Sequence, residues 1–366
     1  MANNLTVAYK GSTIHTASAT GSATLNTAGK YMEGDVALTY TFESGGGGSG
    51  TEDAIITRTI GGAYENSRVT TIGSHAFQYC SSLTTVNFPE ATTIGQYAFG
   101  SCFGLTTLSF PKATAIDFGA FQSCSSLTTV SFPKATIISS YAFQQCRILT
   151  TVNFPEATTI GQYAFFHCPS LTTVSFPKVT YMSAAVFLSC SRLTTVSIPE
   201  ITIIGYSTFQ SCTSLTTVSF PKVTTISSCA FYHCTSLTTV NFPEVTNILS
   251  SVFLSCTRLT TVSFPKTTTI RNQVFQYCSS LTTISFPSAA IFYNSVFYNC
   301  TRLVSLYLLG SSVARLSNSN TFNSTPIGGY STVAGQFGSI YVPSSLYNTY
   351  KASTNWTYFS SRFVSV

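Results

Sequence analysis

The chain has 366 residues, enough for one long domain or for two to three ordinary ones. Only 8% of the residues are charged, against roughly 25% in an average globular domain, so Thr and Ser must supply most of the polar surface. The net charge of +6 is spread without any run of Lys or Arg, which argues against a nucleic-acid-binding groove and makes nucleic acid an unexpected partner.

The N-terminal sequence MANNLTVAYKGSTIHTASATG has no basic stretch followed by an apolar one, as a secretory signal would have. No apolar segment of the chain approaches the roughly 18–20 residues that a membrane span needs. We therefore expect no membrane span and a route out of the cell without a signal peptide. Assembly into a phage particle and release by lysis is one such route, so the expected location is a virion or an extracellular or cell surface.

Residues 1–42 alternate apolar and polar positions, as in Val36, Leu38 and Tyr40. This alternation, with glycines between the runs, predicts a small β-module of short strands, and we expect it to serve docking or oligomerisation. The next segment, residues 43–54, contains the run GGGGSG from Gly45 to Gly50, which is typical of a flexible linker.

From residue 55 to residue 308 the sequence is dominated by one repeat. A cysteine returns every 22 residues, eleven times, and a recurrence of this length marks a solenoid in which stacked coils share one core. The cysteines of this column are Cys80, Cys102, Cys124, Cys146, Cys168, Cys190, Cys212, Cys234, Cys256, Cys278 and Cys300.

Residues 83–104, LTTVNFPEATTIGQYAFGSCFG, represent one coil. A strand begins at Leu83 and is ended by Pro89, which cannot donate to a sheet ladder. The residues expected to face inward are Leu83, Val86, Phe88, Ile94, Phe99 and Cys102, and each recurs at +22. About eleven such coils would give a solenoid roughly 50 Å long at the spacing of strands.

The regular pattern fails after Leu308, and residues 309–366 read as a different segment. A solenoid needs an atypical end to cover its last apolar layer, so we expect these residues to form a C-terminal cap.

The pattern L-x-x-V-x-F-P followed by A-F-x-x-C resembles the leucine-rich repeat. The string I-G-x-x-A-F-x-x-C-x-x-L over residues 68–308 resembles, more narrowly, the BspA-like leucine-rich repeat family of bacterial and protist surfaces and phage proteins. Departures are mild, such as Met182 and Phe292 in the Ile94 column. The flanking strings YKGSTI, TAGKYMEGDV and IYVPSSLYNTYKASTNW resemble sequences attached to such arrays in phage-encoded and gut-bacterial proteins. The resemblance implies a right-handed solenoid with a parallel β-sheet on its concave face.

The eleven column cysteines are expected to be buried, reduced thiols that pack as small apolar residues. Parallel Cβ vectors in neighbouring coils suit a disulfide poorly. Cys229 lies outside the column and is the thiol that we expect to differ in exposure, while its redox state stays open.

A charged residue follows each strand proline from Glu90 to Lys266, and most neighbours along this column alternate in sign. Alternation attracts adjacent coils and disfavours a slip of the stack by one coil. We interpret this column as structural, although a recognition stripe for charged ligands is the alternative.

Two sets of surface residues are candidates for ligand contact. The first is the outward Thr ladder of the strands, which is either a solvated β-face or a broad binding surface. The second is a set of aromatic and His side chains in the variable return segments, where the fold does not dictate the residue. The candidates are Tyr79, Phe166, His167, Tyr232, His233, Tyr277, Tyr298, Thr129, Thr151, Thr173 and Thr195.

Enzymatic and metal-binding interpretations find little support. His167 and His233 lie three coils apart, and the glutamates of the charged column are separated by lysines, which gives no acid and base pair with divergent pKa values. No phosphate-binding glycine loop follows a strand. We expect no enzyme, no cofactor and no metal site.

The sequence therefore predicts non-catalytic binding and display. The leading hypothesis is a phage or prophage tail-associated adhesion protein that recognises a host-surface protein or glycan and docks on the virion or another surface assembly through residues 1–42. A bacterial BspA-like cell-surface adhesin is the first alternative, and a self-assembling solenoid or filament subunit is the second. A homo-oligomer formed through residues 1–42 would suit a tail fibre.

Overall fold

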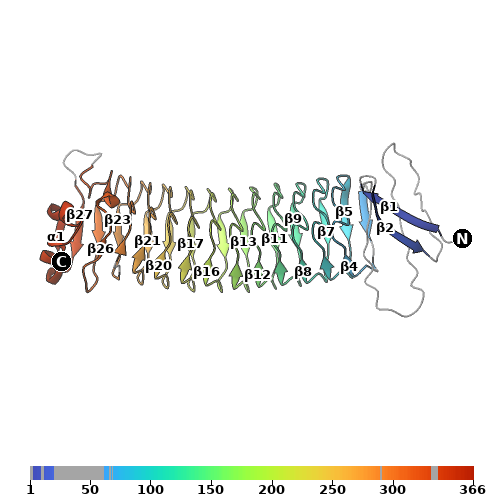
Figure 1. Ribbon diagram of the computed structural model, residues 1–366, viewed down its shortest axis with the longest axis horizontal. Helices are drawn as coiled ribbons and strands as arrows, with labels where there is room; N and C mark the ends of the chain where they lie inside the picture. The colour runs from blue at the N-terminus through green and yellow to red at the C-terminus, as the bar shows by residue number, and fades with distance from the viewer. Residues whose placement is uncertain are drawn as a thin grey trace.

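The computed structural model describes residues 3–9, 12–19, 62–65, 67, 69–288, 291–330 and 337–366. From residue 62 onward the chain winds through short coils that stack side by side into a long rod, with the helical elements α1 and its neighbours at the C-terminal end (Figure 1).

Each coil contributes one strand to a first row, and in most coils this strand begins within the Leu-Thr-Thr motif. These strands are β3 (Gly62–Glu65), β5 (Leu83–Asn87), β7 (Thr107–Ser109), β9 (Thr129–Ser131), β11 (Thr151–Asn153), β13 (Thr173–Ser175), β15 (Thr195–Ser197), β17 (Thr217–Ser219), β19 (Thr239–Asn241), β21 (Thr261–Ser263), β23 (Thr283–Ser285), β25 (Ser305–Tyr307), β27 (Ser339–Val342) and β28 (Phe363–Ser365).

A second row of two-residue strands follows the proline turns. Its strands are β4 (Thr71–Ile72), β6 (Thr93–Ile94), β8 (Ala115–Ile116), β10 (Ile137–Ile138), β12 (Thr159–Ile160), β14 (Tyr181–Met182), β16 (Ile203–Ile204), β18 (Thr225–Ile226), β20 (Asn247–Ile248), β22 (Thr269–Ile270), β24 (Ile291–Phe292) and β26 (Arg315–Leu316).

Neighbouring coils pair in parallel and in strict register. Thr129 lies opposite Thr151 in the first row, and Ile138 lies opposite Ile160 in the second, so equivalent residues of successive coils are neighbours. Each sequence column is therefore a physical row along the rod. The predicted leucine-rich-repeat solenoid with parallel strands is confirmed.

The number of turns differs from the prediction. The structure stacks about 13 turns rather than the expected eleven or so. The cysteine count misses coils at both ends, because β3 precedes the first column cysteine and β27 and β28 extend the first row beyond the last one.

The core consists of side-chain columns with almost no exposure. Phe99 and Phe121 stack with ring centroids 5.2 Å apart and an interplanar angle of 2°, and the same face-to-face contact recurs along the column. All six predicted inward residues of residues 83–104 are buried, from Leu83 to Cys102. Each coil alone would expose its apolar side, so stacking is what stabilises the fold.

The column cysteines are free, buried thiols, as predicted. Ten of them, from Cys102 to Cys300, donate an Sγ–H bond to the backbone oxygen of a phenylalanine in the preceding coil, as Cys102 does to Phe77 at 3.0 Å. Burial raises the pKa of these thiols, to about 12 for Cys190 and Cys234. Cys229 is half-buried, so the predicted difference in exposure is confirmed.

After β25 the chain forms β26, the 3-10 helix η1 (Ser319–Phe322), β27, the 3-10 helix η2 (Ser344–Leu346), the short helix α1 (Tyr347–Ala352), the 3-10 helix η3 (Thr357–Arg362) and β28. Side chains from this segment satisfy the free edge of β26. The indole Nε1 of Trp356 donates to the Ala314 oxygen, and Asn355 Nδ2 donates to the Leu316 oxygen at 2.7 Å. These groups take the place that the backbone N–H groups of a further coil would occupy.

Near the N-terminus, β1 (Asn3–Tyr9) and β2 (Ser12–Ala19) form an antiparallel pair with a register shift between Val7 and Ala8. The remainder of the predicted N-terminal module and the whole of the predicted linker, residues 43–54, lie outside the described residues.

Candidate binding surfaces

The return turn of each coil holds two residues in the left-handed backbone region, four positions apart. Tyr97 has φ +51° and Ser101 has φ +60°, and the same two columns repeat from His75 to Asn299. A non-glycine residue in this region costs roughly 1–2 kcal/mol. Hydrogen bonds between coils offset that cost, since the Ser101 N–H donates to the Gln122 oxygen at 2.7 Å. The turn backbone is thus held by the stack, while its side chains are free to vary.

The predicted aromatic and His candidates all lie on these return turns, with different exposure. Tyr79 and Tyr277 are 45% and 40% exposed, and His233 is also exposed. The half-buried members of the set are Phe166, His167, Tyr232 and Tyr298.

The structure brings some of these residues together in pairs. The rings of Tyr277 and Tyr298 meet edge to face at 5.9 Å. Phe166 lies beside His167, and Tyr232 beside His233, at ring distances of 5.9 and 6.1 Å. Separate coils hold the three pairs, so they do not converge on one pocket.

The four predicted threonines lie on a different face, the outer surface of the first row. Thr129, Thr151, Thr173 and Thr195 are exposed on β9, β11, β13 and β15. Their neighbours one residue earlier have a structural task, because the Thr150 hydroxyl donates to the Thr128 backbone oxygen at 3.0 Å. The predicted candidates are therefore distributed over two faces of the rod.

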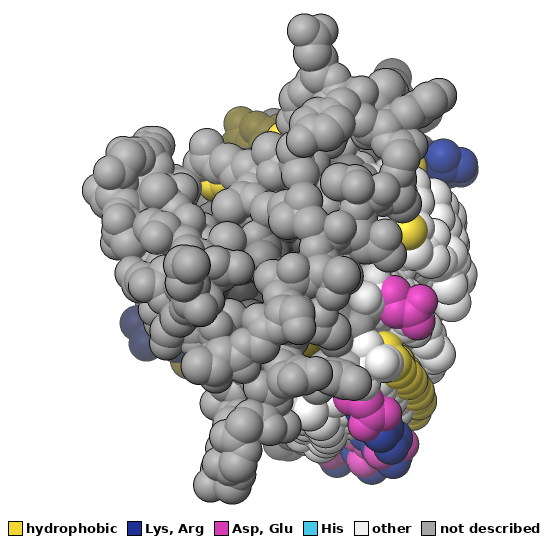
Figure 2. Space-filling model, turned by 90° about the vertical axis from the view of Figure 1, so that its right-hand side faces the viewer, with side chains coloured by type: hydrophobic (Ala, Val, Ile, Leu, Met, Phe, Trp, Pro, Cys, Tyr) yellow, Lys and Arg dark blue, Asp and Glu magenta, His cyan; other side chains and the backbone are white. Residues whose placement is uncertain are grey.

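The charged column runs along the edge where the first-row strands end. Four lysines reach back to the glutamate of the preceding coil, at nitrogen to oxygen distances of 2.6–2.7 Å. The pairs are Glu90 with Lys112, Glu156 with Lys178, Glu200 with Lys222, and Glu244 with Lys266. Figure 2 looks along the rod and shows acidic and basic side chains superposed along one line at its lower edge. Each carboxylate of this column is engaged by a neighbour within the chain.

One row of aromatic rings was not anticipated. His75, Tyr97, Phe118, Tyr141 and Tyr163 form a continuous ladder over five coils, with ring centroids 5.0–5.4 Å apart. A Cβ on Gly119 would lie 2.5 Å from Tyr97 Cε1, so the ring occupies the space that only this residue leaves open. Adjacent rings contact each other at interplanar angles from 28° to 72°, so we interpret this ladder as packing between neighbouring coils.

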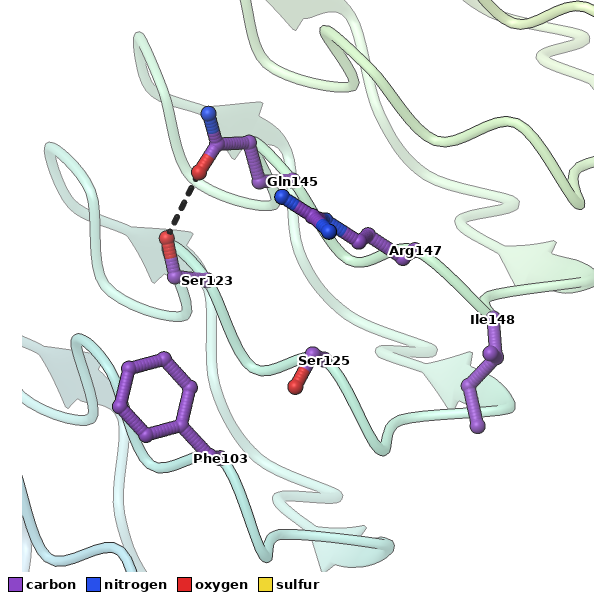
Figure 3. Close-up of a pocket in the computed structure, with 6 residues that line it drawn as sticks. All are labelled: Phe103, Ser123, Ser125, Gln145, Arg147 and Ile148. Carbon is purple, nitrogen blue, oxygen red and sulfur yellow. Dashed lines mark hydrogen bonds between the residues drawn. The ribbon is translucent and has the colours of Figure 1, made fainter.

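A second unanticipated feature is an open groove of about 430 Å³ between neighbouring return turns (Figure 3). We call it the Arg147 groove, and its lining residues are Phe103, Ser123, Ser125, Gln145, Arg147 and Ile148. Phe103 and Ile148 are 51% and 46% exposed. The Ser123 hydroxyl donates to Gln145 Oε1 at 3.2 Å, as the dashed line in Figure 3 marks.

The sequence signal for this groove lies in the two positions that follow each column cysteine, which we call the post-cysteine columns. At the first position eight of the eleven coils place Ser or Thr, and the exceptions are Phe103, Arg147 and Pro169. Six coils place Ser at the second position, where Ile148 is the one large apolar residue. Comparison of the coils with one another at these columns would have identified the groove.

Among the described residues no group of three or more His, Cys, Asp or Glu side chains is arranged to hold a metal ion. The described part of the chain also contains no helix with the length and apolar character to cross a membrane.

Comparison with known proteins agrees with this architecture. The family model of the BspA type leucine-rich repeat region matches residues 64–157, 114–227 and 202–327. The chain belongs to the BspA-type leucine-rich repeat family. The comparison with curated proteins found no match.

The comparison with solved structures found matches to proteins of several bacteria. A leucine-rich repeat protein from Bacteroides ovatus is 20% identical, with 81% of this chain and 88% of that chain covered and a TM-score of 0.55. A leucine-rich cell surface protein from Faecalibacterium prausnitzii is 23% identical, with 82% of each chain covered and a TM-score of 0.46. A leucine-rich repeat protein of T. pallidum is 28% identical, with coverage of 42% of this chain and 78% of that chain and a TM-score of 0.39. At 20% identity the likeness to the Bacteroides ovatus protein concerns the fold alone.

Proposed function

We propose that this BspA-type chain is a non-catalytic adhesion protein that displays its solenoid to a surface protein or glycan of a host. The observation that carries the proposal is the departure of Phe103, Arg147 and Ile148 from the residues that stack the coils. These three side chains are exposed and line a groove, and none of them belongs to a column of the buried core.

A purely structural role would leave the surface as regular as the core. The core columns repeat almost without change over the array, whereas the return turns and post-cysteine columns vary from coil to coil. Surface variation on a regular scaffold is how repeat proteins acquire binding sites.

For the location we propose display on a phage or prophage tail, with residues 1–42 as the docking module and residues 309–366 as the cap of the array. The support is the likeness of both flanks to sequences attached to phage-encoded arrays. Display on a bacterial cell surface is the alternative, and it shares the adhesive role.

Growth into an end-to-end filament is disfavoured by a specific contact. The side chains of Asn355 and Trp356 donate hydrogen bonds to the backbone oxygens of Leu316 and Ala314. A further coil would need the same oxygens as acceptors for its own backbone N–H groups.

Adhesion is tested by incubating fluorescently labelled full-length protein with intact bacterial cells, epithelial cells and surfaces coated with mucin. We expect saturable binding to at least one of them, and its absence from all would overturn the proposal.

Light scattering of the full-length chain and of a chain beginning at Thr51 tests the docking module. A defined oligomer that becomes a monomer on truncation is the expected result, and two monomers would contradict it.

A further inference from the structure

Two residues that line the Arg147 groove lack a hydrogen bond between coils that other residues of the same column make. In the first post-cysteine column the hydroxyl groups of three other coils donate to the backbone of the preceding coil. Thr213 Oγ1 bonds the Ser191 oxygen at 3.2 Å, and Thr257 and Ser279 make the same bond. Phe103 cannot form this bond, and no such bond is made by Arg147. These side chains therefore serve something other than the stack.

The charge of the groove is not neutralised within the chain. No ion pair of the described structure includes Arg147, because the described ion pairs are the four of the charged column. Residues 69–366 carry thirteen basic and five acidic side chains, and four of those five carboxylates are held by lysines. The groove thus offers a free guanidinium on a positively charged array, and a guanidinium fork matches the geometry of a carboxylate.

Apolar and hydrogen-bonding groups flank this guanidinium. Figure 3 shows Phe103 on one side of the groove and Ile148 on the other, with Ser125 and Arg147 between them. Gln145 Oε1 accepts from Ser123, which leaves its amide nitrogen to donate outward. A ligand that fits must combine a carboxylate, an apolar group and several hydroxyl or amide groups within a small volume.

We propose that the Arg147 groove binds an acidic N-acylated sugar, of the sialic acid type, at the end of a glycan chain. The carboxylate pairs with Arg147, the methyl of the acyl group and the C–H face of the ring pack on Phe103 and Ile148, and the hydroxyl groups bond Ser125 and Gln145. At about 430 Å³ the groove is near the lower end of the range for ligand pockets, roughly 300–1,000 Å³, which suits one terminal sugar.

An acidic peptide is the competing ligand, since it also combines a carboxylate with apolar side chains. The sugar fits better because three of the six lining residues, Ser123, Ser125 and Gln145, are hydroxyl or amide donors and acceptors beside a single charge. Apolar side chains of a peptide offer these groups no partner, whereas a sugar presents hydroxyl groups beside its carboxylate.

The experiment is saturation-transfer NMR on the full-length protein with sialyllactose as the probe. Lactose and free glucuronic acid are the neutral and the non-acylated comparisons. We expect transfer to the N-acetyl methyl group of sialyllactose and little transfer to either comparison. Affinity should fall at least about tenfold in Arg147→Gln and in Phe103→Ser, the loss expected when one strong contact is removed.

Arg192→Ser is the matched control. Arg192 is an exposed arginine of the second post-cysteine column and does not line the groove, and Ser is the common residue there. The affinity of the Arg192→Ser variant for sialyllactose should equal that of the unchanged protein. Circular dichroism verifies that all three variants fold, as expected for exposed positions.

Several outcomes would overturn this site. One is the absence of transfer to any acidic sugar, and another is equal affinity of Arg147→Gln and the unchanged protein. Preference for a Glu-Phe-Glu peptide over sialyllactose, lost in Arg147→Gln, would assign the groove to a peptide instead. The inference deepens the proposed adhesive role and can fail separately from it. If Arg147→Gln still adheres to cells as the unchanged protein does, adhesion stands and this site falls.

Discussion

The charged column and the post-cysteine columns lie at opposite ends of the first-row strands and use polar residues in different ways. In the charged column each glutamate is paired with the lysine of the next coil, so a substitution there would break an ion pair. In the post-cysteine columns most coils place a hydroxyl residue, and those of Thr213, Thr257 and Ser279 bond the preceding coil, whereas two turns separated by one coil carry Phe103 and Arg147 instead. We infer that polar residues repeated from coil to coil stabilise the stack, and that irregular residues at the same positions form a binding surface.

The largest expected difference in stability is between substitutions of Phe143 in the core and of Phe103 in the groove. Phe143 is fully buried in the stacked core, and we expect Phe143→Ala to lower the free energy of unfolding by about 3–5 kcal/mol. Phe103 is half exposed, so Phe103→Ser should change it by no more than about 0.5 kcal/mol. Urea denaturation followed by circular dichroism measures both, and equal losses would contradict the division between core and groove.

Thiol reactivity separates the cysteine column from Cys229. The column thiols are buried, and burial raises the pKa of the ten from Cys102 to Cys300 strongly. Cys229 is half-buried, and burial raises its thiol pKa as well. The thiolate is the reactive form, so iodoacetamide should label Cys229 slowly at pH 8 and faster as the pH rises above 9. Mass spectrometry should find a single label under native conditions, and none in Cys229→Ser. Early labelling of several column cysteines would contradict a tightly stacked core.

A smaller effect on the free energy of unfolding is expected at Arg147, which lacks the hydrogen bond to the preceding coil that a threonine could make. Arg147→Thr restores the common residue, whose hydroxyl can bond the preceding coil, and should raise the free energy of unfolding by about 0.5–1.5 kcal/mol. The complementary change Thr213→Val removes the bond to the Ser191 oxygen and should lower it by a similar amount. Thermal unfolding of both variants decides the point, and a destabilised Arg147→Thr would show that the arginine stabilises the fold.

The smallest effect concerns the charged column. Glu156 and Lys178 form an ion pair at 2.6 Å with both side chains about half exposed. Glu156→Gln should lower the free energy of unfolding by no more than about 1 kcal/mol, and the difference should disappear in 1 M salt because screening then acts over about 3 Å. A loss that persists in high salt would indicate a role in packing rather than in charge pairing.

The coil itself could be predicted from the sequence because its period is visible in every core column. A cysteine at every 22nd residue, with Leu83, Phe88 and Phe99 at constant offsets from it, defines which side chains face inward. The number of turns could not be obtained in this way, since β27 and β28 join the first row without a cysteine or a constant spacing.

The candidate surfaces depended on tertiary structure. The sequence singled out aromatic residues such as Tyr79 and Tyr277, which lie on separate return turns, and threonines that lie on another face of the rod. The Arg147 groove arises because Phe103 and Ile148, 45 positions apart in the numbering, are brought to one place by coils that stack in register. The repeat determines the direction in which each column points. Which irregular side chains meet across neighbouring coils is decided only when the coils stack, because that contact depends on the distance between turns and not on sequence order.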